Sequence, residues 1–135
     1  MDAKDYPRFN VEVRGLVTQR SYSGEFQVRP WLTKRLDLAR DRLRREYLGG
    51  YAIEKADEQA AGLANALSQI NIRVTESPQW WRDLDGGLDC ADDNLVLEVY
   101  RKCMEAEAAA VQAERDRANG AVKAVDPVTR ESAAK

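Results

Sequence analysis

The sequence predicts an α+β fold, in which a small antiparallel sheet, made of an N-terminal hairpin and one further strand, packs with three main helices. Apolar and polar residues alternate over 9–17 and again over 25–29, which is the period of half-buried strands. Three later segments repeat apolar residues every three or four positions, as helices with one buried face do. The chain has 135 residues, the length of one domain, and residues 1–118 are expected to form it.

The two N-terminal strands are expected to form a hairpin. A reversal at Gln19 and Arg20 places apolar residues opposite each other on one face, as a hairpin register requires. The facing pairs are then Val13 with Phe26, Val11 with Val28, and Gly15 with Gly24. Neither turn residue favours positive φ, so a longer loop with the same register is preferred. The two opposed glycines indicate a bend or the close approach of another backbone.

The three main helices are expected at 33–48, 54–69 and about 94–117. Thr33 is a candidate N-cap for the first helix, and the glycine pair after residue 48 ends it. The second helix is rich in alanine, which allows close packing but buries little area per turn. On the third helix, two adjacent apolar rows fade into alanines and charges after Met104.

Shorter elements connect these helices. Alternation over 70–75 predicts a third strand, and Ser77 followed by Pro78 predicts the start of a short helix. Residues 83–94 are expected to form a loop rich in aspartate and glycine, in which Asp92 or Asp93 caps the last helix. Residues 119–135 have no period and few large apolar groups, and are expected to form an extended tail.

The composition excludes several kinds of active site. The chain has no histidine, which removes Ser-His-Asp and Cys-His nucleophiles and histidine-ligated metals. Its two cysteines, Cys90 and Cys103, form no C-x-x-C motif, and both are expected to be free thiols, with Cys103 buried. No leader or membrane-spanning run is recognised. We therefore expect no catalytic residues, no cofactor and no small-molecule substrate.

The acidic loop is the main candidate for a metal or acid–base site. Asp83 and Asp85 match the first and third positions of an EF-hand loop, but Leu88 replaces its glycine and Asn94 its final glutamate. The carboxylates of Asp89, Asp92 and Asp93 lack any sign of a cleft that would perturb their pKa values. A turn and a helix cap explain the same residues, so no metal site is predicted.

Charge is divided unevenly along the chain. Residues 1–50 carry a net charge of +4, residues 51–107 of −7 and residues 108–135 of +1. The two halves either offset each other within one molecule or join neighbouring molecules head to tail. The basic helix 33–48 is a candidate for phosphate contacts, but its interleaved acidic residues form ordinary helix-surface pairs, and nucleic acid is not the expected partner.

Apolar side chains outside the strand and helix faces are the candidate partner-binding residues. Trp80 and Trp81 are adjacent on a short helix and cannot both point the same way, so one is expected in the core and the other nearer the surface. Core packing and partner contact remain alternatives for each tryptophan. The full set of candidates is Trp31, Trp80, Trp81, Val122, Val125 and Val128.

The order of these features suggests a class of protein. A hairpin bearing glycines, a charged helix ending in LGG, an alanine-rich helix, a strand and the segment SPQWW…GGLDCADDNLVLEVY follow one another. Across residues 9–107 this pattern resembles the small accessory proteins of tailed-bacteriophage morphogenesis clusters. The resemblance implies a non-enzymatic protein that acts through protein contacts, and it assigns no residue roles.

The expected function is therefore protein–protein interaction within a phage virion, as a capsid, neck or tail accessory protein. Its expected partners are other phage structural proteins, copies of itself, or both, with no membrane partner. One alternative is a tail assembly chaperone that is absent from the finished particle. Another is a small nucleic-acid-binding regulator that uses the basic helix 33–48. The expected location is the virion or the host cytoplasm.

Overall fold

The computed structural model describes residues 1–49 and 57–123, with side chains through Gly120. A short 3₁₀ helix, η1 (Ala3–Asp5), precedes the strands β1 (Arg8–Arg14) and β2 (Ser21–Val28). These are followed by α1 (Lys34–Tyr47), α2 (Glu58–Arg73), β3 (Val74–Glu76), α3 (Gln79–Asp83) and α4 (Asp93–Lys123). The strands form one antiparallel sheet in the order β1-β2-β3, and the predicted α+β class is confirmed.

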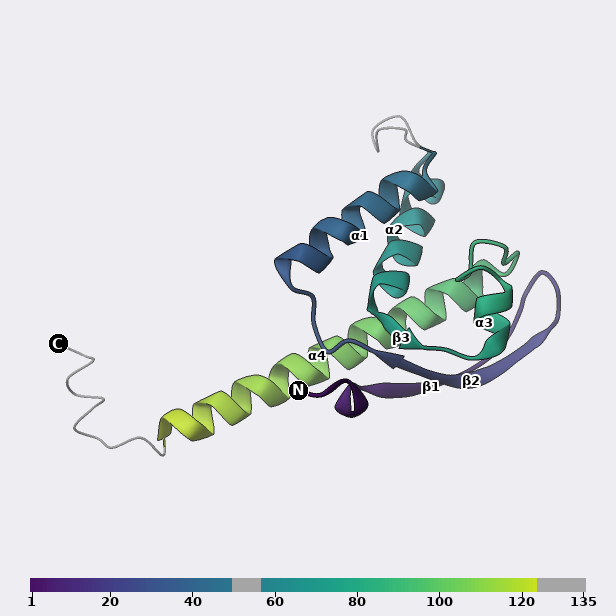
Figure 1. Ribbon diagram of the computed structural model, residues 1–135. Helices are drawn as coiled ribbons and strands as arrows, with labels where there is room; N and C mark the ends of the chain where they lie inside the picture. The colour runs from purple at the N-terminus through teal and green to yellow at the C-terminus, as the bar shows by residue number, and fades with distance from the viewer. Residues whose placement is uncertain (50–56, 124–135) are drawn as a thin grey trace.

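The helices form a layer over the sheet (Figure 1). The first half of α4 packs on β1, β2 and α2, and α1 packs on α2. The core lies between sheet and helices and joins apolar side chains from every strand and helix around it. Its most deeply buried members are Val11, Phe26, Val28, Ile70, Trp81, Leu95, Val99 and Cys103.

The hairpin is present, but its predicted register is wrong. Phe26 pairs with Phe9 instead of Val13, and Val13 pairs with Tyr22. The chain turns earlier than predicted, over Gly15–Arg20, with hydrogen bonds from Gly15 N to Arg20 O and from Gln19 N to Gly15 O. The displacement is an even number of residues, so the same side chains still face the core.

Both hairpin glycines are sites of close approach, although they do not face each other. Gly24 lies opposite Val11, and a Cβ there would stand 2.9 Å from Pro78 Cβ. A Cβ on Gly15 would overlap the carboxyl group of Asp92. The groups that approach the two glycines are therefore side chains. The sequence predicts a bend or the approach of another backbone instead.

The boundaries of three later elements also differ from the predictions. Residues 70–73 continue α2 instead of starting a strand, because Ile70 extends the apolar helical row of Leu63 and Leu67 into the core. Pro78 holds the cap position of α3, with no side-chain hydrogen bond from Ser77 or any other residue to cap it. The residues of the second predicted helix that precede 57 lie outside the described residues.

The last helix is longer than predicted. It extends to Lys123, so residues 119–123 are helical where an extended tail was expected. Residues 124–135 lie outside the described part of the chain. The first helix matches its prediction closely, since the Thr33 hydroxyl accepts from Leu36 N at 3.3 Å and Gly49 follows with φ of 68°.

Candidate functional site

Two of the three tryptophans belong to an aromatic cluster. Trp81 is 2% exposed, and its ring stands edge-on to Phe26 at 5.6 Å. Trp80 is half-buried against Tyr22 and Phe26, and its Nε1 donates to Ser23 O at 3.0 Å. As predicted, one of the pair lies in the core and the other nearer the surface. A partner could reach Trp81 only by opening the core.

Trp31 lies apart from this cluster, beside a surface pocket. It is half-buried directly after β2, and the pocket has a volume of about 220 Å³. The pocket is lined by residues that include Met1, Tyr6, Arg29, Pro30, Trp31 and Leu36. Trp31 therefore borders a hollow at the surface of the domain.

The three predicted tail valines lie beyond the side chains that the structure describes. Val122 lies on the last turn of α4, beyond the described side chains. Val125 and Val128 lie outside the described residues. Their role as partner contacts remains a prediction.

The turn between β1 and β2 is held by a buried carboxylate that the sequence did not single out for this role. Asp92 is fully buried, and its Oδ1 accepts from Val17 N at 2.8 Å and Thr18 N at 2.9 Å. Its Oδ2 accepts from Thr18 Oγ1 at 2.6 Å and Tyr22 Oη at 3.0 Å. The sequence predicts Asp92 or Asp93 as the cap of α4. The side chain of Asp92 instead binds the hairpin.

These donors stabilise the charged form of the carboxylate. The hydroxyl of Thr18 is the largest influence, and with the two backbone N–H groups and Tyr22 it lowers the pKa of Asp92 to about 2, against the opposing effect of burial. Burial in turn raises the pKa of the Tyr22 phenol above its ordinary value. At neutral pH the turn is therefore fastened to the start of α4 by a carboxylate that stays ionised.

The same turn presents two apolar side chains to solvent. Leu16 is 74% exposed and Val17 is 69% exposed. Asn94 adds a second fastening beside Asp92, since its Oδ1 accepts from Leu16 N at 3.1 Å and its Nδ2 donates to Arg14 O at 3.0 Å. Two adjacent apolar side chains thus stand in water on a turn whose backbone is held in place, which makes the turn a candidate contact surface.

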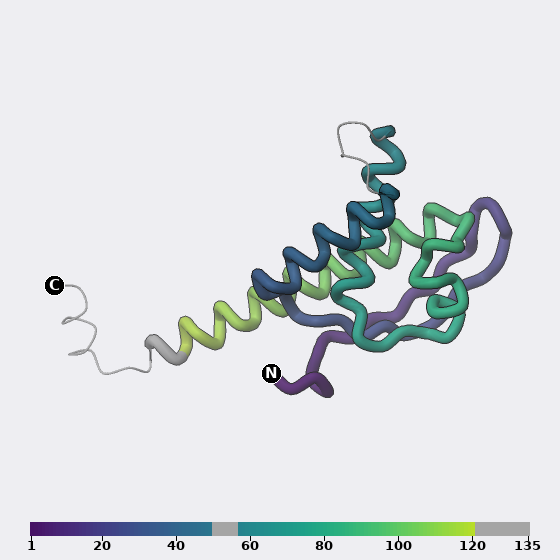
Figure 2. Tube along the Cα trace, turned by 45° about the horizontal axis from the view of Figure 1, so that its top comes forward, coloured from purple at the N-terminus to yellow at the C-terminus, as the bar shows by residue number. Residues whose placement is uncertain are grey.

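The second half of α4 extends beyond the rest of the domain (Figures 1 and 2). The fully buried residues of α4 end at Cys103, and every residue from Arg115 through Gly120 is exposed. A lone helical segment of this length is only marginally stable in water, because most helix stability in proteins comes from packing of one face. This segment is therefore a second candidate surface.

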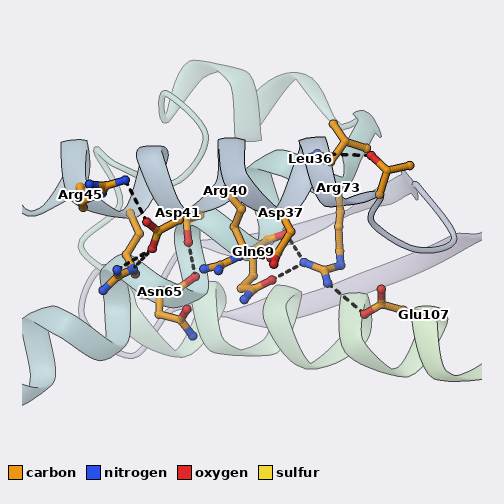
Figure 3. A network of polar contacts seen from close by, with 12 residues as sticks. Leu36, Asp37, Arg40, Asp41, Arg45, Asn65, Gln69, Arg73 and Glu107 are labelled. Atoms are coloured by element: carbon orange, nitrogen blue, oxygen red, sulfur yellow. Dashed lines mark hydrogen bonds and ion pairs between the residues drawn. The ribbon is translucent and has the colours of Figure 1, made fainter.

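Three of the five arginines of α1 pair with aspartates of the same helix (Figure 3). Arg40 pairs with Asp37 at 2.9 Å, and Asp41 pairs with Arg44 at 2.6 Å and with Arg45 at 3.0 Å. In the described residues no ion pair joins α1 to the acidic loop, and the two lie on opposite sides of α2 in Figures 1 and 2. The interleaved carboxylates thus reduce the positive charge available for phosphate contacts.

A partly buried ion pair joins α2 to α4 in the same view. Arg73 Nη2 lies 2.9 Å from Glu107 Oε2, and Arg73 Nη1 donates to the backbone and side chain of Gln69 (Figure 3). Among the residues that the structure describes, no group accepts a hydrogen bond from the buried Nε of Arg73. This contact is the outermost polar link between α4 and the domain in the described region, and it marks where the free part of the helix begins.

The remaining candidate groups are the acidic side chains and the two cysteines. Among the residues that the structure describes, no group of three or more metal-ligating side chains comes together. Both cysteines are free, as predicted, and burial raises the pKa of the Cys103 thiol to about 12. Over the same described residues, no helix combines the length and apolar character needed to cross a membrane.

Comparison with known protein families, curated proteins and solved structures finds no match for this chain. The surfaces of the chain itself therefore indicate what it could bind. Two features are missed by the sequence patterns. One is the binding of the hairpin turn by the buried Asp92 carboxylate, and the other is the pair of exposed apolar side chains on that turn. The turn carried a usable signal, because Leu16 and Val17 stand beside a glycine at the end of a strand pattern, whereas nothing local connects Asp92 to residues 17–22.

Proposed function

We propose that this chain is a non-enzymatic association component of a tailed-bacteriophage particle, which works by binding other protein subunits. The uncovered second half of α4 carries the proposal. A helix that continues far beyond its own core gains stability when another protein covers it. Its alanines at 108–110 and 113 would allow a partner backbone to come close.

The phage setting of the proposal comes from the pattern of residues 9–107. The engagement of the α1 arginines with neighbouring aspartates favours protein over nucleic acid as the partner.

Truncation tests the role of α4. Deletion of residues 115–135 removes exposed helix and the remainder of the chain, so the domain should stay folded by circular dichroism while its association weakens in sedimentation velocity. Deletion of 124–135 alone is the matched control, because it leaves the described helix complete. If the shorter deletion has the full effect, or neither has any, α4 does not carry the association.

Mass spectrometry of purified particles separates a virion component from an assembly chaperone. A component should be present at fixed stoichiometry. A chaperone should be found in the infected cell but be absent from the particle, which would contradict the proposed place in the virion while leaving the binding role intact.

A further inference from the structure

The outer face of α1 combines an exposed leucine with a hollow between two arginines. Leu38 is 72% exposed, and no residue of α1 is buried. Arg35 precedes Leu38 by three positions and Arg42 follows it by four, so the three side chains lie on one side of the helix. A surface hollow of about 470 Å³ is lined by Arg35, Leu38, Ala39 and Arg42.

The net charge of α1 is +3. The helix contains one lysine and five arginines against two aspartates and one glutamate. Arg40, Arg44 and Arg45 pair with the two aspartates. Arg35 and Arg42 form no ion pair with any residue that the structure describes. The two guanidinium groups that border the hollow are therefore the ones open to an incoming anion.

An aliphatic side chain flanked by carboxylates matches this hollow. Leu38 and Ala39 form its apolar wall, and carboxylates are strong acceptors for guanidinium donors. A phosphate backbone would also bind the arginines, but it would leave Leu38 in water. The chemistry of the hollow thus suits a protein segment better than it suits nucleic acid.

The loop between α3 and α4, residues 84–92, carries this combination. Leu88 is 42% exposed, and the nearby side chains of Asp85 and Asp89 are exposed as well. The loop backbone is fixed, because Leu88 N donates to Asp85 O at 3.3 Å and Asp89 N donates to Leu84 O at 2.9 Å. Docking of a preformed loop costs little conformational entropy.

This end of the domain is negative even when its arginines are counted. Five aspartates lie between residues 83 and 93. Arg82 precedes the loop, and Arg14 and Arg20 flank the hairpin turn that Asp92 binds. Five negative charges against three positive ones leave a net charge of −2. The loop and the outer face of α1 are therefore opposite in charge.

We propose that the outer face of α1 binds the α3–α4 loop of a second copy of this chain, with Leu88 entering the hollow beside Leu38. The aspartates next to Leu88 then meet Arg35 and Arg42. Within one molecule, α1 and the loop lie on opposite sides of α2 (Figures 1 and 2), so different copies make this contact. The inference rests on the proposed function, since it names a second copy as one of the protein partners.

The two surfaces are different patches of one molecule, so the contact is heterologous. Repeated contacts of this kind close into a ring or continue as a filament, according to the rotation between copies. The charges set the orientation and the rate of encounter, and the paired leucines exclude water from the centre of the contact.

Charge reversal on the two surfaces tests the contact. Arg42→Glu and Asp89→Arg should each weaken self-association in sedimentation velocity by about tenfold, because attracting charges become repelling ones. A mixture of the two variants should regain association, since the reversed residues attract each other and the unchanged surfaces still match. Glu12→Arg is the matched control, because Glu12 is an exposed acid on β1 outside both surfaces, and it should leave association unchanged.

Several results would overturn the proposal. They are a chain that stays monomeric at high concentration, reversed variants that associate as well as the natural chain, and a mixture that fails to regain association. If Arg42→Glu associates normally but loses binding to double-stranded DNA in a gel-shift assay, the face binds nucleic acid and the docking is wrong.

Directed disulfide formation tests the proposed neighbours. In a Cys90→Ser background, chains with Leu38→Cys mixed with chains with Leu88→Cys should give a cross-linked heterodimer under oxidation. Neither variant should cross-link efficiently alone. A homodimer of Leu38→Cys chains would indicate a symmetric contact between two α1 helices and would refute the docking.

These outcomes are separable from the test of the proposed function. If Arg42→Glu and Asp89→Arg associate normally while deletion of 115–135 prevents association, the docking is wrong and the α4 proposal stands. If the two reversals prevent association while the deletion has no effect, the α4 proposal is wrong and the docking stands.

Discussion

Gly15→Ala and Gly62→Ala make the same chemical change and should have opposite effects on stability. At Gly15 the added Cβ would lie 2.5 Å from Asp92 Oδ1 and closer still to two other carboxyl atoms, where ordinary contact begins at 3.4 Å. At Gly62, on the exposed side of α2, a Cβ meets nothing within 4 Å. Sterics therefore oppose the first change and not the second.

The magnitudes follow from these distances. Relief of the overlap requires the turn and Asp92 to move apart by about 1 Å, which stretches the hydrogen bonds from Val17 and Thr18 and should cost about 1–3 kcal/mol. Gly62→Ala removes backbone freedom from the unfolded chain and should stabilise by about 0.5–1 kcal/mol. At roughly 4 °C per kcal/mol, Tm should fall by about 4–12 °C in the first variant and rise by about 2–4 °C in the second.

Thermal unfolding followed by circular dichroism measures both variants, and a double-mutant cycle isolates the cause. In an Asp92→Ala background the overlap is gone, so Gly15→Ala should cost less than it does in the natural chain. If Gly15→Ala leaves Tm within about one degree, or costs as much without the Asp92 carboxyl as with it, the close packing of turn and carboxylate is wrong.

Three further predictions concern the core, the carboxylate and the thiols. Phe26→Ala should lower the free energy of unfolding by about 3–5 kcal/mol in urea titration, because it empties a site packed by Phe9, Trp80 and Trp81; a loss below about 1 kcal/mol would contradict that packing. Asp92 has a lowered pKa, so its stabilisation should be complete above about pH 4 and lost as pH falls towards 2; in Asp92→Asn, acid titration of stability should lose this component, and an unchanged acid limb would argue against it. A thiol reagent should modify half-buried Cys90 well before buried Cys103, as judged by mass of digested peptides, and the reverse order would be inconsistent with their burial.

Alternation of apolar residues predicted which side chains face the core but not which of them pair. Val11 and Phe26 are buried as the pattern requires. Shifting one strand along the other by any even number of residues keeps the same side chains facing the core, so alternation alone does not choose the register. The observed register brings Phe9 opposite Phe26, where their rings stack at 5.4 Å, and the predicted register does not. Tyr22 lies between the two alternating segments 9–17 and 25–29 and so outside the predicted strands, yet it forms part of the core.

Local pattern also failed where tertiary contacts decide the structure. Ile70 and Ile72 alternate with polar residues as a strand would, yet Ile70 also continues the row of Leu63 and Leu67, and packing against α4 favours the helix. Asp92 looked like an ordinary helix cap, since its partners Val17 and Thr18 lie more than seventy positions earlier. The sequence predicts α4 as a long helix. It does not predict that the second half of this helix extends beyond the packed part of the domain.

The fastening of the hairpin turn by Asp92 should be visible in amide hydrogen exchange. Val17 and Thr18 lie in an exposed turn, where backbone amides ordinarily exchange within seconds or less, yet both amides donate to a buried carboxylate. Exchange of these amides then requires the turn to separate from the start of α4. The two segments lie more than seventy positions apart in the sequence. The protection of these two amides would therefore report the local stability of the contact between the first hairpin and the last helix.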